Sequence, residues 1–253
     1  MNHDSIDLAP HHLPFSHKTE HSVGILVSHG LTSTTSSMRP LAESFADAGF
    51  HVELPCLRGH GTQWQDLNRV TYQDWLEDME VALAALQVRC EKVFVCGLSL
   101  GGALVLHLAH DHPEIAGVVL INHVAVFTNP KFWFVPLIHR MIPSTPAVGS
   151  DIKKPDTLEM AYPRTPSTAV NEMLKLMKVN RKRMPDTWQP TLIFKSLEDH
   201  VVPVKSAEWT MKHLGSKEKE LVLLTNSYHV APLDHDQKII EERSLEFFRS
   251  RGE

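Results

Sequence analysis

The sequence predicts an α/β protein whose core is a mostly parallel sheet of about six to seven strands flanked by helices. Short apolar runs rich in β-branched residues alternate along the chain with stretches of helical periodicity. Strands are expected near residues 23–27, 50–54, 92–97, 116–121, 190–195 and 219–224, and helices near 36–48, 71–89, 99–111, 204–215 and 234–250. This alternation favours parallel neighbours, because each helix returns the chain to the start of the next strand. The 253 residues, 42% of them hydrophobic, are expected to form a single domain over 1–253.

The stretch before the first expected strand is rich in histidine. Its members are His3, His11, His12, His17 and His21. Their spacing is irregular and lacks the companion ligands of a zinc site. We therefore expect a solvated N-terminal arm, and we expect neither a metal nor another cofactor.

A G-x-S-x-G turn follows the strand expected at 92–97. Residues 97–101 read GLSLG, and helical spacing resumes directly after them. This strand-turn-helix context is that of a nucleophile elbow, with Ser99 exposed at a helix N-terminus. The glycines are needed because side chains two positions before and after the serine would collide with the neighbouring strand and helix. We expect Ser99 to be a catalytic nucleophile.

A serine nucleophile needs a histidine base and a carboxylate that orients it. Asp199 follows the strand at 190–195, and His229 follows the strand at 219–224. Chemistry in open α/β sheets gathers at the carboxyl ends of the strands, where all three residues fall. Glu198 and His200 flank the aspartate and remain alternatives, whereas Asp234, His235 and Asp236 begin the last helix, where acidic residues most often act as caps.

The loop after the first strand predicts an oxyanion hole. Residues 28–32 read SHGLT, and a His-Gly turn of this kind aims the next backbone N–H, that of Leu31, at the oxyanion. The N–H of Leu100 is the expected second donor. His29 is interpreted as a buried residue that packs the turn, and the loop at 57–61 as architecture near the site.

The alternation of strands and helices is interrupted between the core segments 22–121 and 190–253. Residues about 122–189 contain eight prolines and two helical patches, 132–141 and 167–184, which we interpret as a cap over the catalytic face. The methionine-rich stripe at 173–177 suits either packing onto the core or contact with an acyl chain. The aromatic triplet at 132–134 suggests transient contact of the cap with a membrane or micelle surface.

Several segments together resemble the bacterial monoacylglycerol lipases, an α/β-hydrolase branch close to small bacterial carboxylesterases. The similarity lies in residues 24–30, 59–61, 97–101, 149–153, 159–163, 198–203 and 226–231. The elbow alone marks the superfamily, whereas the segments at 149–163 and 226–231 are more specific. The resemblance implies an α/β-hydrolase fold, Ser99, Asp199 and His229 as the catalytic triad, and Leu31 and Leu100 as oxyanion donors.

The resemblance also implies a substrate. In such lipases a cap glutamate hydrogen-bonds the glycerol hydroxyls, and the similar position here is Glu159, which could equally be a solvated charge. The expected reaction is hydrolysis of monoacylglycerols to glycerol and fatty acid through an acyl-enzyme. The alternatives are a broad-specificity carboxylesterase for short- to medium-chain esters and, from another class, a non-enzymatic ligand-binding scaffold.

Composition excludes other classes of function. The net charge of -5 offers no basic stripe for nucleic acid, so the expected partner is a small lipid ester. The first residues lack the pattern of a signal peptide, and the three cysteines follow no disulfide pattern. We expect a cytoplasmic protein that is a monomer or homodimer.

Overall fold

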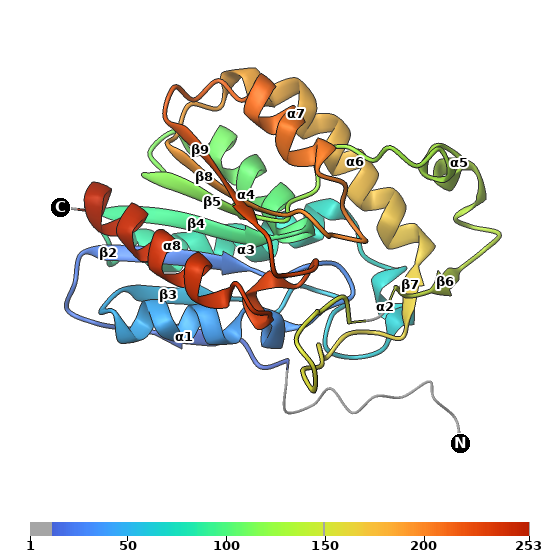
Figure 1. Ribbon diagram of the computed structural model, residues 1–253, viewed down its shortest axis with the longest axis horizontal. Helices are drawn as coiled ribbons and strands as arrows, with labels where there is room; N and C mark the ends of the chain where they lie inside the picture. The colour runs from blue at the N-terminus through green and yellow to red at the C-terminus, as the bar shows by residue number, and fades with distance from the viewer. Residues whose placement is uncertain (1–11, 149, 253) are drawn as a thin grey trace.

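The computed structural model describes residues 12–148 and 150–252, and its centre is a seven-stranded sheet (Figure 1). The strand order is β1-β3-β2-β4-β5-β8-β9, with every neighbouring pair parallel except β1 and β3. The strands are β1 (Phe15–His17), β2 (Val23–Ser28), β3 (His51–Leu54), β4 (Lys92–Leu98), β5 (Gly117–Ile121), β8 (Thr191–Ser196) and β9 (Lys219–Leu224). The central strands are buried on both faces, as expected for continuous apolar runs. The predicted fold class is confirmed.

Helices cover both faces of this sheet. On one face α1 (Arg39–Asp47) packs with α8 (Gln237–Gly252), where the rings of Phe45 and Phe248 lie 5.2 Å apart in an edge-to-face contact. On the other face lie α3 (Tyr72–Gln87), α4 (Leu100–Asp111) and α7 (Lys205–His213). Two separate apolar clusters, one on each face, therefore hold the sheet in place.

The N-terminal segment differs from the expected arm. Phe15–His17 pairs antiparallel with β3, with Phe15 opposite Leu54, and the guanidinium of Arg39 lies 4.3 Å from the centre of the Phe15 ring. The expectation of a solvated arm is thus wrong at β1, because a three-residue strand is too short to show a period in the sequence. His3 and His11 lie outside the described residues.

The segment between β5 and β8 lies above the carboxyl ends of the strands. It contains α5 (Lys131–Ile138), the antiparallel pair β6 (Ser144–Pro146) and β7 (Arg164–Pro166), α6 (Ser167–Arg183) and the 3₁₀ turn η2 (Met184–Asp186). α6 packs on α3 and α4, whereas α5 projects from the body of the molecule (Figure 1). Short elements also lie in other loops: α2 (Trp64–Leu67), η1 (Thr35–Ser37) and η3 (Ala231–Leu233).

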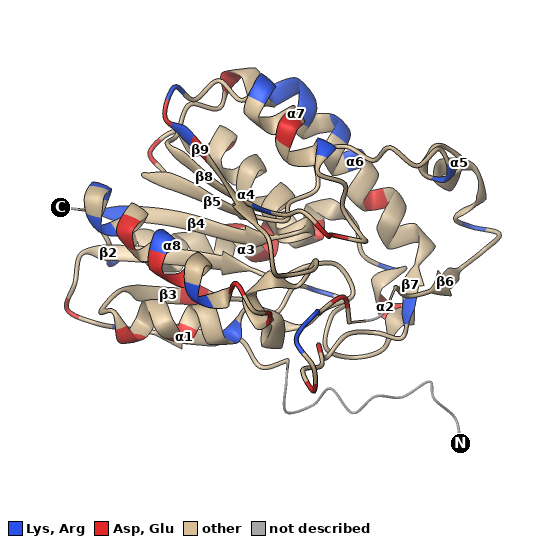
Figure 2. Cartoon of the chain, viewed as in Figure 1, with Lys and Arg blue, Asp and Glu red and all other residues tan. Residues whose placement is uncertain are grey.

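Charged side chains of both signs alternate on the outer helices, notably α8, while α5 carries little charge (Figure 2). Within residues 12–148 and 150–252, no helix combines the length and the apolar character that crossing a bilayer requires. The cytoplasmic location remains a prediction.

Candidate active site

Ser99 lies between β4 and α4 in a strained backbone conformation. Its φ of 55° and ψ of -113° fall outside the regions that a residue with a side chain prefers, at a cost of about 1–3 kcal/mol. Such strain persists where the surrounding structure enforces it, as at the turn between a buried strand and a buried helix. The turn presents the serine side chain to a cavity above the sheet.

The glycines around Ser99 have no room for a side chain. A Cβ added to Gly97 would lie 2.3 Å from the backbone carbon of Gly101, and one added to Gly101 would lie 2.5 Å from the carbonyl oxygen of Ser28. A Cβ on Gly102 would lie 2.4 Å from the Cβ of His123. The collisions expected from the sequence are therefore present on both the strand side and the helix side.

The ring of His229 is hydrogen-bonded to Asp199. Nδ1 of His229 lies 3.1 Å from Oδ1 and 3.0 Å from Oδ2 of the carboxylate. Because a carboxylate only accepts, Nδ1–H donates and Nε2 keeps a lone pair that can take a proton. The backbone N–H groups of Val201 and Val202 donate to Oδ1 of Asp199 at 2.9 and 2.8 Å, which fixes the carboxylate.

Asp199 has a second partner, a cation, that the sequence analysis did not identify. The buried ammonium of Lys195 forms an ion pair with Oδ2 of Asp199. Burial alone raises the pKa of Asp199, but His229 and Lys195 outweigh that effect and hold it well below its usual range. Both partners therefore favour the ionised carboxylate.

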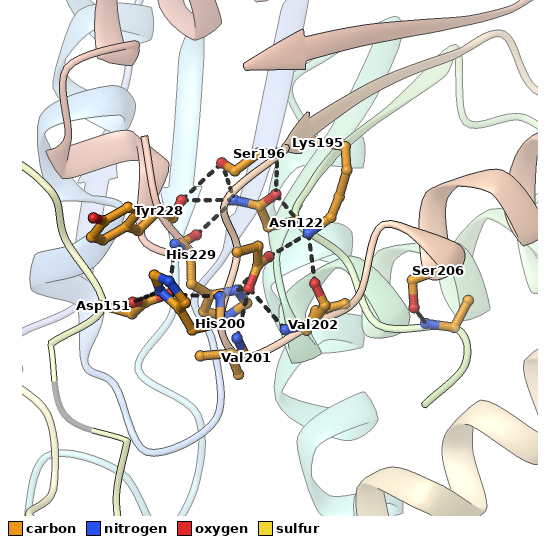
Figure 3. A network of polar contacts seen from close by, with 12 residues as sticks. Asn122, Asp151, Lys195, Ser196, His200, Val201, Val202, Ser206, Tyr228 and His229 are labelled. Atoms are coloured by element: carbon orange, nitrogen blue, oxygen red, sulfur yellow. Dashed lines mark hydrogen bonds and ion pairs between the residues drawn. The ribbon is translucent and has the colours of Figure 1, made fainter. Parts of the chain in front are cut away.

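Asn122 connects three strands at the base of the site (Figure 3). Its Nδ2 donates to the backbone oxygen of His229 at 2.8 Å and to Oγ of Ser196 at 2.9 Å, while Oδ1 accepts from the backbone N–H of Ser196 at 2.8 Å. The residue has a φ of 42°, which is unusual for a side chain other than glycine. It joins the end of β5 to β8 and to the histidine loop after β9.

The loop after β2 passes directly beside the serine. A Cβ added to Gly30 would lie 3.4 Å from the Cβ of Ser99, and Leu31 lines the same cavity. Leu100 is the first residue of α4, so its N–H has no carbonyl partner within the helix. The N–H of Leu100, one expected oxyanion donor, thus follows Ser99 directly in the chain. Leu31, which carries the other expected donor, belongs to the loop that passes beside Ser99.

His29 holds this loop as a neutral residue. Its Nε2 accepts from the backbone N–H of Leu57 at 3.2 Å, so Nδ1 carries the proton and donates to the carbonyl of Gly30 at 3.0 Å. Burial lowers the pKa of His29 to about 4, although the bond to Gly30 opposes the shift. The expectation of a buried residue that packs the turn agrees with this environment.

One cavity of about 560 Å³ brings the candidate residues together. Ser99, Asp199, His229, Leu31 and Glu159 all line it. The remaining walls are largely apolar and come mostly from the segment between β5 and β8, including Phe127, Phe132, Val135, Ile138, Ile142, Val170 and Met173. The cavity therefore brings Ser99 and His229 together with a space suited to an aliphatic chain.

Comparison with known proteins shows the family of this chain. The serine aminopeptidase S33 family matches residues 19–236. A thermostable monoacylglycerol lipase of Bacillus sp. (strain H-257) is 46% identical over 227 residues, which is 89% of this chain and 90% of the relative. The chain belongs to this α/β-hydrolase family. It is a carboxylic ester hydrolase, and its resemblance to the bacterial monoacylglycerol lipases is confirmed.

Solved structures of hydrolases support the same fold. A structure reported for the metagenome-derived lipolytic enzymes LipS and LipT is 41% identical, covers 94% of this chain and 97% of its own, and has a TM-score of 0.90. The monoacylglycerol lipase of Paleococcus ferrophilus shares the fold at 19% identity, with a TM-score of 0.80 and coverage of 94% and 98%. A second relative in sequence, the carboxylesterase of Bacillus subtilis (strain 168), is 24% identical over 88% of this chain and 91% of its own.

Glu159 lines the cavity of this hydrolase, beside the loop that follows β2. Its backbone N–H donates to Oγ of Ser150 at 2.7 Å, and its carboxylate interacts with the side chain of Ser33. Burial raises the pKa of Glu159, while Ser33 and the imidazole of His229 partly oppose the shift. A half-buried carboxylate on a cavity wall is not the solvated surface charge that was the alternative interpretation.

The flanking candidates for the triad have other partners in this hydrolase. His200 is exposed, and its Nδ1 contacts Oδ1 of Asp151 at 2.7 Å, while Glu198 forms an ion pair with Lys153 at 2.9 Å. Oδ2 of Asp151 also accepts from the backbone N–H of His229 at 3.1 Å. The two segments most specific to the resemblance, 149–163 and 226–231, therefore meet at the histidine.

The acidic residues before α8 hold neighbouring loops. Oδ1 and Oδ2 of Asp234 accept from the backbone N–H groups of Lys154 and Lys153, and Oδ2 also accepts from that of Tyr228. Asp236 accepts from the N–H of Asn226. These contacts direct both carboxylates toward the histidine loop and the segment at 153–154.

Proposed function

We propose that this hydrolase cleaves monoacylglycerols to glycerol and fatty acid, with Ser99, His229 and Asp199 as its catalytic triad. The observation that carries the proposal is the hydrogen-bonded pair of His229 and Asp199 in the same cavity as the strained Ser99. The relative that is 46% identical is named a monoacylglycerol lipase, which supports the choice of substrate.

The reaction proceeds through an acyl-enzyme. Nε2 of His229 takes the proton of Ser99 as Oγ bonds to the ester carbonyl carbon, and Asp199 stabilises the imidazolium. The carbonyl oxygen becomes an oxyanion, which accepts hydrogen bonds from the N–H groups of Leu31 and Leu100. Its collapse breaks the bond to the glycerol oxygen, which receives the proton from His229. Water, deprotonated by the same imidazole, then attacks the acyl carbon. The bond to Oγ of Ser99 breaks, the fatty acid leaves, and Oγ takes the proton back from His229.

The cavity supplies a place for each half of the substrate. The acyl chain lies against the apolar side chains of α5 and α6, with Met173 as a flexible contact. Glu159 accepts hydrogen bonds from the glycerol hydroxyls. A broad-specificity carboxylesterase with the same triad is the second candidate, because the apolar walls accept any acyl chain and only Glu159 favours glycerol.

The cap, residues 122–189, also serves as a docking surface for lipid aggregates. On and beside α5, Trp133 and Leu137 are each 75% exposed, and Met141 is 81% exposed. An apolar group of this kind on a nearly uncharged helix suits insertion among lipid headgroups and acyl chains.

The nucleophile is tested with Ser99→Ala and, as a matched control, Ser250→Ala near the end of α8. We expect Ser99→Ala to lower kcat for monoacylglycerol hydrolysis on the order of 10⁶-fold and to abolish labelling by a fluorophosphonate, because the attacking oxygen is gone. The control should retain wild-type turnover. Appreciable esterase activity in purified Ser99→Ala would refute the triad.

A further inference from the structure

Lys195 is a fully buried lysine beside the proposed triad. It belongs to β8, its side chain has a relative exposure of 0%, and it follows the apolar run Leu192, Ile193 and Phe194. Lysine is almost never buried without a partner, because desolvation of its charge is costly. Its burial here therefore requires a specific compensating interaction.

The contacts of Lys195 identify it as an ammonium ion. Besides the ion pair with Oδ2 of Asp199, Nζ donates to the carbonyl of Val202 at 2.8 Å and to Oδ1 of Asn122 at 3.2 Å. Three acceptors around one nitrogen match the three N–H donors of an ammonium, whereas a neutral amine has only two. The ammonium and the imidazole of His229 thus share the carboxylate of Asp199.

We propose that Lys195 is a positioning residue that fixes Asp199 and shares its negative charge with His229, so that His229 acts as a base at lower pH than it otherwise would. The inference rests on the proposed function only for the triad of Ser99, Asp199 and His229. A cation bound to the same carboxylate repels the imidazolium, and it weakens the attraction that holds the proton on the ring.

The pKa shift of Lys195 is consistent with a charge shared through Asp199. Burial lowers the pKa of Lys195, and attraction to Asp199 opposes that effect. Other charged groups lie on the segments near His229 and stay in place when Lys195 is replaced: Asp151, Lys153 and Glu159 from the cap, Glu198 and His200 from the loop after β8, and Asp234 from the loop before α8. A comparison of variants at position 195 therefore isolates the effect of the ammonium.

The test is the pH profile of kcat/KM for p-nitrophenyl butyrate with Lys195→Met, a substitution that keeps length but removes charge. We expect the midpoint of the acid limb to move upward by about one to two pH units. Lys219→Met, at the start of neighbouring β9, is the matched control, because Lys219 donates only to the carbonyl of Leu214 among its described contacts. Its acid limb should coincide with that of the wild type.

If Lys195 had only a structural role, its replacement would lower the stability of the protein and leave the acid limb of the pH profile unchanged. An acid limb of folded Lys195→Met within about 0.3 pH unit of the wild type would therefore overturn the proposal. If Lys195→Met fails to fold, Lys195→Gln is measured in the same way, and failure of both to fold also overturns it. Lys195→Arg, which retains the cation, should keep the wild-type limb.

The substrate of this experiment separates the two proposals. Hydrolysis of p-nitrophenyl butyrate requires the triad but no recognition of glycerol. A hydrolase that does not cleave monoacylglycerols would thus still give an interpretable profile, and a failed triad would already be evident from Ser99→Ala.

Discussion

At the scale of single residues, the proposed function assigns the choice of alcohol to Glu159. The cavity walls that face the acyl chain are apolar, while Glu159 presents a carboxylate from the segment that also contacts the histidine loop. Desolvation of that carboxylate is offset only in part by Ser33, so hydroxyl donors of a ligand would complete its hydrogen bonding.

Replacement of Glu159 by Ala should separate the two candidate substrates. We expect kcat/KM for a monoacylglycerol to fall by about 10- to 100-fold, the worth of a hydrogen bond to a charged group, while the methyl ester of the same acid changes by less than about twofold. Glu198→Ala, which removes an exposed carboxylate outside the cavity, is the control. Equal losses on both esters would contradict glycerol recognition and favour the carboxylesterase.

At the scale of elements, α5 carries exposed apolar side chains beside the cavity. Its neighbour α6 buries Leu176 fully against the core, whereas α5 has no buried residue. Phe132 turns inward and stacks on Phe127 with ring centres 3.8 Å apart, while Trp133 and Leu137 point away from the core. One helix thus contributes both to the cavity and to the outer surface.

The double variant Trp133→Ser, Leu137→Ser should reduce hydrolysis of monoacylglycerols presented in micelles or vesicles by at least about tenfold, because each exposed apolar side chain contributes to insertion. Hydrolysis of dissolved p-nitrophenyl butyrate should remain unchanged. Val81→Ser, Val88→Ser at α3 removes apolar side chains that are 67% and 85% exposed, and it serves as the control. An equal effect on both substrates would speak against docking at α5.

Long elements were predictable from the sequence, and short ones were not. The strands at 92–97 and 190–195 and the helix at 71–89 appear close to their expected bounds, because each shows several periods of its pattern. β1, β6 and β7 have three residues each, and two of them contain proline, so no period identifies them. The predicted sheet thus lacked its antiparallel edge strand.

In the candidate site, too, some residues could be predicted from a local sequence pattern and others could not. Ser99, Asp199 and His229 could be placed because each follows a recognisable strand. Asn122 and Lys195 could not, since their importance depends on contacts with residues far away in the chain. Asn122 bonds to residues 74 and 107 positions further on, and Lys195 stands in what reads as an ordinary buried strand.

For the whole molecule, buried neutral histidines make stability depend on pH. His29, His60 and His123 are at most 4% exposed. Burial lowers the pKa of His29 to about 4 and that of His123 to about 3, and it lowers the pKa of His60 well below its usual value, with His29 adding to the effect. The folded protein therefore binds fewer protons than the unfolded chain between the ordinary histidine pKa and these lowered values.

The sign of the linkage follows from that difference. The histidine contribution is fully present above about pH 6.5 and is lost as the pH falls toward 4, while the raised pKa of Glu159 acts in the opposite direction. We expect the free energy of unfolding to fall by about 3 kcal/mol per pH unit near pH 5.5, as measured by denaturant titration. His123→Gln should reduce this slope by about 1.4 kcal/mol per unit. An unchanged slope in that variant would contradict a neutral buried His123.

The attachment of residues 150–162 to the core has a consequence for how specificity can evolve. Asp151 is bonded to the histidine loop, the N–H groups of Lys153 and Lys154 are bonded to Asp234, and the N–H of Tyr162 donates to the carbonyl of Thr32 at 2.9 Å. The wall that carries Glu159 is thus fixed to the loop of His229, whereas α5 contributes other side chains to the same cavity. If the proposed function holds, changes in α5 can therefore retune the length of the fatty acid released without disturbing the selection of its alcohol.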